Sequence, residues 1–559
     1  MQQRRPVYEA AHLGLVLLRC GCIGSDNRRR RPAATGNLVS EILLPVDIGG
    51  FDACFASPRV IFFPARPGTL CLALGGLLMR RVIFAASFSF TIACVSVAQS
   101  RPQFSPGVRD FIKIDSASVA LIHVRVIDGT GAAPRENQTV VFTDGKITAV
   151  GDFSNTPISG GAKVLDLIGY TVIPGFVGMH DHMYYPSPSG PPAMYPEHAT
   201  SFPRLYLAGG VTSIRTTGSL EPYADLAIKK AIDEGRMAGP KMHITGPYLE
   251  GAGSFTPQMH ELRDAEDARK TAEFWMDQGV TSFKAYMHIT PDELAAAVKA
   301  AHARGIKVTG HLCSIGFREA AAIGIDDLEH GLVVDTEFFS GKKPGVCPNA
   351  QEADKEIAEK LDIESAPVQD MIRDLVARHV AITSTLPVFE TLVPNRAPLT
   401  KRVLDAMLPE ARIAYLSTRS AISDNAANSF WPALFKKELQ FERDFVKAGG
   451  LLLAGLDPTG YGGVVPGFGD QREVELLVEA GFTPLEAIHI ATANGAQFLG
   501  ELDRVGTLAA GKAADIVVIH GDPSANIADI EKVELVFKDG IGYDSPKLIE
   551  SVRGLVGLR

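Results

Sequence analysis

Two histidines separated by a single residue, His180 and His182, end an apolar run in the segment VIPGFVGMHDHMYY. Proline and glycine interrupt this run, which favours a short buried strand entered through a turn over a helix. Residues two apart in a strand point to the same side, so both imidazoles face one space and Asp181 faces away from it. Two imidazoles on one face are half of a metal site. Because the chain has 14 histidines, such a pair also arises by chance, and the other ligands must be sought elsewhere.

Four other side chains that can bind a metal ion stand within or after short apolar runs further along the chain. They are Lys284 in TSFKAYM, His311 in VTGHL, His330 in LEHG and Asp457 in AGLDPTG. Each one alone has an ordinary explanation, since a histidine after a strand is usually a hydrogen-bonded loop residue and a strand lysine usually extends its amine to solvent. Their use as ligands therefore depends on whether the fold brings them together.

The elements that carry these residues alternate regularly from Pro174 onward. Eight short apolar runs are separated by amphipathic segments such as YADLAIKKAIDEG and PDELAAAVKAAHARG. Eight strands alternating with helices over residues 174–499 predict a TIM (β/α)8 barrel. The functional residues of such a barrel lie at the carboxyl ends of its strands. All six candidates would then converge on one mouth.

Strand and turn patterns flank the predicted barrel on both sides. From Val119 to about Gly169, β-branched and polar residues alternate and are punctuated by glycine and Asp-Gly pairs, which is typical of a small antiparallel sheet. After Leu499 the same pattern returns in DRVGTLAAGKAADIVVIHGDP and KVELVFKDG. We therefore expect an α/β protein in which the barrel is inserted into a small composite β-sandwich domain, built from residues 99–173 and 500–559.

The combined motifs resemble the amidohydrolase superfamily, in particular its imidazolonepropionase-like and prolidase-like branch. They are PGFVGMHDH, FKAY, GH at 310–311, EHG at 329–331, GLDP and the tail GTLAAGKAADIVVIHGDP, and they span about residues 119–540. The resemblance implies two metal ions: one bound by His180, His182 and Asp457, one bound by His311 and His330, with Lys284, carboxylated by carbon dioxide, bridging both. Leu456 stands where a small or hydroxyl residue often precedes the aspartate, which leaves the ligand intact but weakens inference about the substrate.

The donor chemistry agrees with this ligand set. Neutral imidazoles and carboxylate oxygens suit zinc and its neighbours among the divalent metals. A free ammonium cannot bind a cation, so Lys284 must lose its proton; as a carbamate it offers two oxygens and a negative charge, enough to span two metal ions about 3.5–4 Å apart. Without carboxylation, a site with one metal ion is the alternative.

A binuclear site of this kind predicts hydrolysis. Two divalent ions lower the pKa of a bridging water to about 7 and so supply hydroxide at neutral pH, while Asp457 can pass the proton to the leaving nitrogen. The expected enzyme cleaves an amide or peptide-like C–N bond of a small substrate: a dipeptide, an N-acyl amino acid or a cyclic amide. Tyr286 shares a face with Lys284 and is a candidate substrate contact, although a tyrosine packed in the barrel is an equal alternative. Activity on esters, lactones or phosphotriesters uses the same ligands, and a non-catalytic exported binding protein would retain the same fold.

The first hundred residues differ from the rest. In MRRVIFAASFSFTIACVSVAQS, Met79 and two arginines precede an apolar run that ends in small residues, as in a secretory signal peptide over residues 79–98. Residues 1–78 lack periodicity and are interpreted as an upstream extension from a mis-assigned start; a genuine basic extension or a signal anchor is the alternative. We expect an exported protein, periplasmic or secreted. Cys94 leaves a lipid anchor open.

Charge and cysteine content limit the partners. Residues 1–98 hold 11 Arg, no Lys and 5 acidic residues, whereas residues 99–559 hold 44 basic and 59 acidic residues. An acidic body without a basic cluster argues against nucleic acid and leaves a small molecule as the expected partner. Beyond residue 98 the cysteines are Cys313 and Cys347, and two cysteines do not define a disulfide framework. Whether the chain forms a homo-oligomer stays open.

Overall fold

The computed structural model describes residues 103–186, 194–397 and 399–557. The predicted upstream extension (1–78) and signal peptide (79–98) lie outside these residues, as does part of the loop after the first predicted barrel strand. The described chain is a mixed α/β protein with two kinds of sheet. One is a nine-stranded mixed sheet, and the other kind comprises two purely parallel sheets of three and five strands.

The nine-stranded sheet is composite, because both ends of the described chain contribute to it. Its strand order is β1-β17-β16-β15-β6-β2-β3-β4, with β5 paired to β2. The strands are β1 (Ile112–Ile114), β2 (Ser118–Val126), β3 (Arg135–Thr143), β4 (Lys146–Asp152), β5 (Lys163–Asp166), β6 (Tyr170–Pro174), β15 (Ile516–His520), β16 (Val533–Lys538) and β17 (Ile541–Asp544). The antiparallel pair β6–β15 aligns Pro174 with Ile516 and thereby joins the two flanks. The predicted pairing of the flanks is thus present, whereas a second sheet stacked on this one, as a sandwich requires, is not assigned among the described residues.

Two hairpins of this sheet follow from Asp-Gly pairs in the sequence. Asp144–Gly145 connects β3 to β4, and Asp539–Gly540 connects β16 to β17. All four residues have φ between 48° and 79°, and two-residue hairpin loops with positive φ at both positions favour Asp-Gly because glycine meets no steric cost there. Apolar residues on alternate positions of the paired strands, such as Leu121, Val140 and Phe142, form their own buried cluster.

Eight parallel strands follow in chain order and carry the predicted chemistry. They are β7 (Phe176–Asp181), β8 (Val211–Thr216), β9 (Lys241–Ile244), β10 (Ser282–Ala285), β11 (Lys307–Gly310), β12 (Asp327–Glu329), β13 (Ala381–Ser384) and β14 (Leu452–Ala454). The sheets β7-β8-β9 and β10-β11-β12-β13-β14 are linked by parallel bridges from Thr245 to Ser282 and from Leu249 to Ala285. All eight predicted strands are therefore present. Their assigned ladders do not close into a ring.

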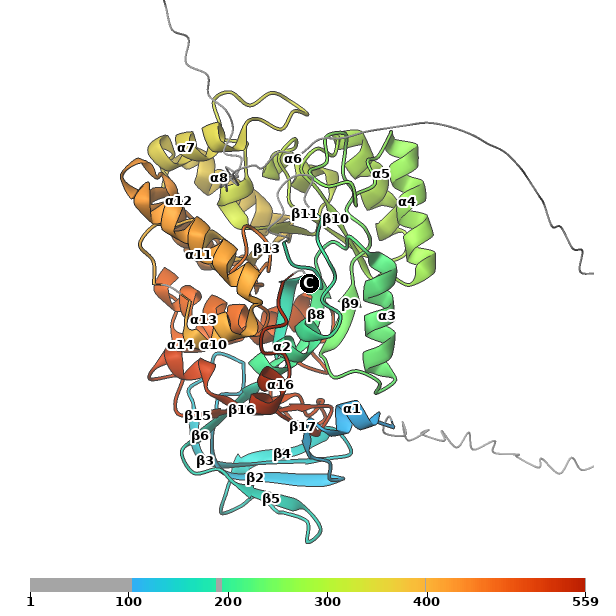
Figure 1. The fold of residues 1–559 in the computed structure, drawn as a ribbon, viewed down its shortest axis with the longest axis vertical. Helices are drawn as coiled ribbons and strands as arrows, with labels where there is room; N and C mark the ends of the chain where they lie inside the picture. Colours follow the sequence, from blue (N-terminus) through green and yellow to red (C-terminus); the bar gives the residue numbers. More distant parts are fainter. Residues whose placement is uncertain (1–102, 187–193, 398, 558–559) are drawn as a thin grey trace, which may run out of the picture. The chain divides into compact units, whose positions relative to one another are not determined.

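Helices lie between successive strands of this set, and others precede β1 or follow β14. They are α1 (Pro106–Arg109), α2 (Ser201–Gly209), α3 (Pro222–Asp233), α4 (Ala265–Gln278), α5 (Pro291–His302), α6 (Phe317–Ile323), α7 (Ala350–Lys360), α8 (Ala366–Ala377), α9 (Leu386–Glu390), α10 (Lys401–Ala406), α11 (Pro409–Asp424), α12 (Trp431–Lys447), α13 (Phe468–Ala480), α14 (Pro484–His489), α15 (Gly495–Phe498) and α16 (Ser545–Glu550). In Figure 1, α3, α4 and α5 flank the parallel strands on one side, and α7, α8, α11 and α12 lie on the other.

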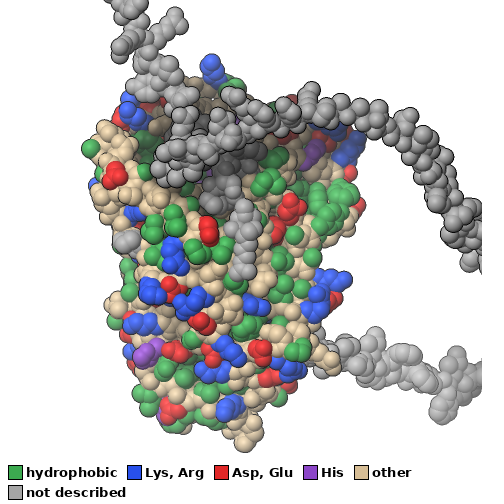
Figure 2. Space-filling model, viewed as in Figure 1, with side chains coloured by type: hydrophobic (Ala, Val, Ile, Leu, Met, Phe, Trp, Pro, Cys, Tyr) green, Lys and Arg blue, Asp and Glu red, His purple; other side chains and the backbone are tan. Residues whose placement is uncertain are grey.

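Local sequence explains where several helices begin. Helix α5 starts with a capping box in which the side chains of Thr290 and Glu293 each accept a hydrogen bond from the other's backbone N–H, and Pro291 occupies its first turn. Asp264 caps α4 by accepting from the backbone N–H of Asp267, and Gly279 ends it with φ 98°. Among the described residues, none of the helices combines the length and the apolarity needed to cross a bilayer. On the described part of the face in Figure 2, basic and acidic side chains are interspersed.

Candidate metal centre

His180 and His182 come from the end of β7 and are almost fully buried. Nδ1 of His180 lies 2.7 Å from Oε2 of Glu329, and Nδ1 of His182 lies 3.1 Å from the carbonyl oxygen of Gly218. Since both partners accept, each ring carries its proton on Nδ1 and turns the lone pair of Nε2 toward Asp457. Nε2 of His182 is buried and has no hydrogen-bond partner in the described part of the chain. A metal ion would satisfy this orphaned acceptor.

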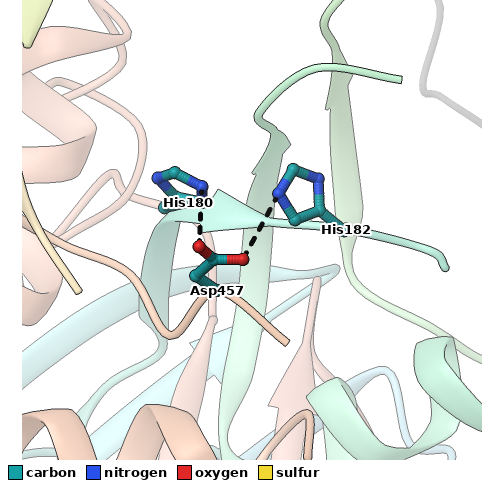
Figure 3. Close-up of side chains that lie close together, drawn as sticks. All are labelled: His180, His182 and Asp457. Carbon is teal, nitrogen blue, oxygen red and sulfur yellow. Dashed lines mark ion pairs between the residues drawn. The ribbon is translucent and has the colours of Figure 1, made fainter. Parts of the chain in front are cut away.

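Asp457 faces both of these Nε2 atoms from beyond the end of β14. Its Oδ2 lies 3.7 Å from Nε2 of His180, and its Oδ1 lies 3.7 Å from Nε2 of His182 (Figure 3). The three ligand atoms lie within 4.8 Å of one another. Two ligands bound about 2.1 Å from a tetrahedral metal ion stand about 3.4 Å apart. The two histidine–aspartate distances of 3.7 Å are therefore too long for direct hydrogen bonds and close to that of ligands sharing one cation.

A glycine allows this approach of β14 to β7. A Cβ placed on Gly455 would lie 2.3 Å from Cβ of His180 and 2.6 Å from its backbone nitrogen, distances that no side chain can occupy. Two residues later the backbone N–H of Asp457 donates to the carbonyl oxygen of His180 at 3.0 Å. Asp457 itself has φ 51°, a left-handed conformation that aspartate tolerates better than most residues. The local sequence Gly-Leu-Asp thus fixes the carboxylate beside His180.

Lys284, His311 and His330 lie around this group, so the six predicted ligands converge. Nζ of Lys284, on β10, is 3.1 Å from Nε2 of His180 and fully buried. The ring centroid of His330 is 4.5 Å from the centroids of both His180 and His311. Nδ1 of His330 lies 3.9 Å from Oδ2 of Asp457 and 2.7 Å from Oγ1 of Thr385.

Burial sets the protonation of these groups in the absence of metal. Loss of hydration lowers the pKa of all four histidines, His180, His182, His311 and His330, well below the usual 6.5, and the neighbouring Lys284 lowers it further. Neutral imidazole is the form that binds metal. Burial also lowers the pKa of Lys284 to about 8 and raises the pKa of Asp457 to about 6, against the opposing effect of Lys284.

A buried ionic network supports the ligand His180 from behind. Nη2 of Arg215, on β8, donates to Oδ2 of Asp327 at 2.7 Å and to Oε1 of Glu329 at 2.8 Å, and its Nε donates to the carbonyl oxygen of Met179 at 2.9 Å. Glu329 therefore holds His180 with one oxygen and Arg215 with the other. Sequence reasoning assigned no role to Glu329. The available signal was Asp-Leu-Glu on β12, two carboxylates spaced by two in a buried strand.

The comparison with known families shows which family the chain belongs to. The family model described as "Amidohydrolase family" matches residues 171–541, well over half of the chain. The chain belongs to the amidohydrolase family. Members of this family are metal-dependent hydrolases, and the buried group of His180, His182 and Asp457 is a candidate metal site in the matched region. The predicted resemblance is thereby confirmed.

Individual relatives of this amidohydrolase are distant but match along most of their length. A dihydroorotase of Pelotomaculum thermopropionicum is 26% identical over 410 residues, covering 70% of this chain and 86% of that protein. An imidazolonepropionase of Nocardia farcinica is 26% identical over 423 residues, covering 72% and 90%. The solved structure of a Xaa-Pro dipeptidase with bound methionine matches with a TM-score of 0.57 at 19% identity, covering 76% of this chain and 100% of that one, which supports the fold.

Aromatic side chains line one side of the metal centre of this amidohydrolase. The ring of Tyr286 packs 4.8 Å from that of His311 and 4.8 Å from that of Tyr248. The ring of Tyr184 stacks on His182 at 4.5 Å, and its hydroxyl is hydrogen-bonded to that of Tyr248. Burial raises the pKa of Tyr286 well above 10, so its hydroxyl stays protonated and can donate. Tyr286 was predicted as a substrate contact; the neighbouring tyrosines were not.

Two other histidines near strand ends lie outside the group. His243 forms an ion pair with Glu501 at 3.5 Å, and Nδ1 of His288 lies 3.0 Å from Oε1 of Glu250. Neither joins the ligand cluster.

A disulfide joins Cys313 to Cys347. It links the segment just after the candidate ligand His311 to the loop before α7. Sequence reasoning could not pair these cysteines.

Proposed function

We propose that this amidohydrolase is an exported enzyme that uses two divalent metal ions, zinc by the nature of the donors, to hydrolyse a C–N bond of a small substrate. The observation that carries the proposal is the convergence of the buried His180, His182 and Asp457 beside the buried amine of Lys284, with Nε2 of His182 unpaired in the described part of the chain. A purely structural role would not require an unpaired buried Nε2 on His182.

The residues divide into two ligand groups in this proposal. His180, His182 and Asp457 would hold one ion, His311 and His330 would hold the other, and Lys284, as a carbamate, would contribute a ligand to both. Two ions held this way would supply hydroxide at neutral pH and polarise a substrate carbonyl. The lowered pKa of Lys284, about 8, supports carboxylation because only the neutral amine reacts with carbon dioxide.

Asp457 acts in this proposal as the general acid and base. Its carboxylate offers two oxygens, Oδ2 toward His180 and Oδ1 toward His182 and the hydroxyl of Thr459. One oxygen would bind metal while the other would take the proton of the attacking water. The same oxygen then returns the proton to the leaving nitrogen. A positioned acid or base of this kind typically contributes about 10²–10⁴ in rate. The hydroxyl of Tyr286 donates a hydrogen bond to the substrate carbonyl or to a substrate carboxylate.

The substrate is proposed to be a dipeptide, an N-acyl amino acid or a cyclic amide. Two observations support a small amide over a polymer. The relatives of the chain include proteins named dihydroorotase and imidazolonepropionase. In addition, the buried Tyr184 stands close to His182 and the partly buried Tyr286 stands close to His311, which favours a compact substrate with apolar surface.

The proposal also includes closure of the barrel. The eight parallel strands form a closed barrel, supported by the hydrogen bond from the backbone of Asp457 to that of His180, which brings the last strand to the first.

The chain is exported after cleavage near residue 98. The disulfide of Cys313 and Cys347 supports export, because disulfides persist in oxidising compartments. Mass spectrometry of the secreted protein should find no peptide upstream of Ala98, and abundant peptides from residues 1–78 would contradict this part.

The function is tested by measuring metal content together with hydrolysis. The purified protein should contain about two metal ions per chain, lose activity with a chelator and regain it with zinc. A panel of Xaa-Pro dipeptides, N-acyl amino acids, cyclic amides, lactones and phosphotriesters separates the substrate classes. Turnover of an amide with the best kcat/KM supports the proposal. A metal-loaded protein that prefers lactones or phosphotriesters, or that hydrolyses none of the panel, contradicts it.

A further inference from the structure

A cavity of about 170 Å³ lies between helices α9, α10, α11 and α13. None of its lining residues is a candidate metal ligand, so it is separate from the metal centre. Two of the segments that line it nevertheless directly follow residues of that centre in the sequence. Helix α9 directly follows Thr385, the hydrogen-bond partner of His330. Residues 463–465 belong to the segment that follows Asp457.

Three of the four arginines that line the cavity are neutralised by carboxylates. Nη2 of Arg396 lies 2.6 Å from Oε1 of Glu390, and Nη2 of Arg472 lies 2.7 Å from the same oxygen. Nη2 of Arg402 lies 2.9 Å from Oε1 of Glu531. Such pairs are ordinary surface and boundary ion pairs, and their charges need no further partner.

Arg419 is different, because its charge is buried without a counterion. Its side chain is 7% exposed, and among the described residues no carboxylate lies within 4.0 Å of its guanidinium. Nη1 donates to the carbonyl oxygens of Thr391 at 2.9 Å and Val393 at 2.7 Å, and Nη2 donates to that of Arg396 at 2.9 Å. These carbonyls use three of the five N–H groups, and the hydroxyl of Tyr461 is a further hydrogen-bond partner of the guanidinium. None of these partners carries a net charge. An anion in the cavity would supply the missing charge, since a buried cation is costly unless paired.

The rest of the lining is largely apolar. Pro387, Val403, Val465 and Phe468 contribute to it, and Val403 and Phe468 are buried side chains. A dry apolar cavity of about 150 Å³ is large enough to bind benzene, so this one can accept a single ring or a branched chain together with a small polar group. The volume of the cavity and its one unpaired positive charge therefore both suit a small anion with an apolar body.

We propose that this cavity binds a small organic carboxylate, with its charged group at Arg419 and its apolar body against Val403 and Phe468. Benzoate is the matching probe, and benzamide is a control of the same shape without charge. Calorimetric titration of the metal-loaded enzyme should show saturable benzoate binding at this site, with benzamide bound at least about tenfold more weakly, as expected when a charge-assisted hydrogen bond is lost.

Two variants separate this cavity from the metal centre, which can also bind a carboxylate. Val403→Phe fills the cavity without touching the hydrogen bonds of Arg419, and it should remove one benzoate site per chain while metal content is unchanged. Ile413→Phe, on the exposed face of α11, is the matched control and should bind as the parent does. Arg419→Gln should weaken benzoate at least about tenfold and abolish its advantage over benzamide.

Arg419→Gln also removes donors from three backbone carbonyls and can destabilise their loop, so its thermal unfolding is measured alongside. If that variant does not fold, the Val403→Phe titration alone decides the question. The proposal is overturned if benzoate and benzamide bind equally well, if Val403→Phe binds benzoate with the stoichiometry of the parent, or if the parent shows no binding at millimolar benzoate. Because metal content and hydrolysis are measured separately, either result leaves the test of the proposed function intact.

Discussion

Glu329 holds Nδ1 of His180 at 2.7 Å across 149 positions of sequence, with both side chains fully buried. Its other oxygen accepts from Arg215 at 2.8 Å. A carboxylate behind a ligand histidine fixes the orientation and the tautomer of the ring and makes it a better donor to metal. The position of His180 in the metal centre is therefore set by three strands, β7, β8 and β12.

Glu329→Gln should weaken this support while nearly preserving the volume. The amide can still contact His180 but loses the charge that pairs with Arg215. Metal affinity should fall about 10–100-fold, the usual effect of changing such a partner, measured by competition with a chelator. The matched control is Glu293→Gln, which changes a buried glutamate that caps α5 and should leave metal affinity unchanged. Unaltered affinity in Glu329→Gln would show that the contact does not support the ligand.

Gly455→Ala tests the close approach of β14 to β7. The added methyl would lie 2.3 Å from Cβ of His180, so one of the two strands must shift. We expect a loss of about 1–3 kcal/mol in unfolding free energy, typical of overpacking, and a loss of bound metal because Asp457 moves with its strand. Chemical denaturation and metal analysis measure the two effects.

Gly161→Ala is the control for this variant, since nothing lies within 4 Å of the Cβ it would add. If Gly455→Ala retains both stability and metal, the geometry that we describe for Asp457 is wrong.

Carboxylation of Lys284 should make metal uptake by the apo-protein depend on pH and on carbon dioxide. With a pKa of about 8, the reactive neutral amine rises from about 9% at pH 7 to about 91% at pH 9. Uptake at constant dissolved carbon dioxide should therefore quicken about tenfold over this range and level off above it. The histidines have pKa values well below 6.5, and the pKa of Asp457 is about 6, so neither contributes in this window.

Lys284→Ala is the control for the uptake experiment. Metal uptake by this variant should depend neither on pH over this range nor on carbon dioxide. The variant should regain some metal in the presence of short carboxylic acids that replace the carbamate. Uptake by the parent that is equally fast with and without carbon dioxide would contradict the bridging role of Lys284.

Sequence periodicity was sufficient to place the candidate ligands at strand ends, because each one stands within or after its own short apolar run. His180 lies at the end of β7 and His182 just after it, and Asp457 follows a short apolar run, so each could be placed at a strand end. The eight parallel strands and the pairing of the two flanks through β6 and β15 followed from the same alternation.

The features that sequence could not provide depend on contacts between distant segments. Glu329 contacts His180 only because the fold brings the end of β12 close to the end of β7. Cys313 and Cys347 meet through two loops, and the charge of Arg419 is isolated by the way α11 packs on the segment after α9. No spacing rule in one strand or helix encodes these partners. The closure of the barrel and the stacking of a second sheet also require more than the alternation of elements.

The most direct test of the central claim is the turnover number of Asp457→Asn, measured on enzyme whose metal content has been determined. Asparagine has nearly the same size but cannot accept the proton of the attacking water at neutral pH. The variant should fold, retain much of its metal through the four histidines and Lys284, and lose kcat by about 10² or more, with a far smaller change in substrate binding. Turnover within a few-fold of the parent, in a variant shown to carry its metal, would contradict the role of Asp457 as general acid and base and with it the proposed mechanism.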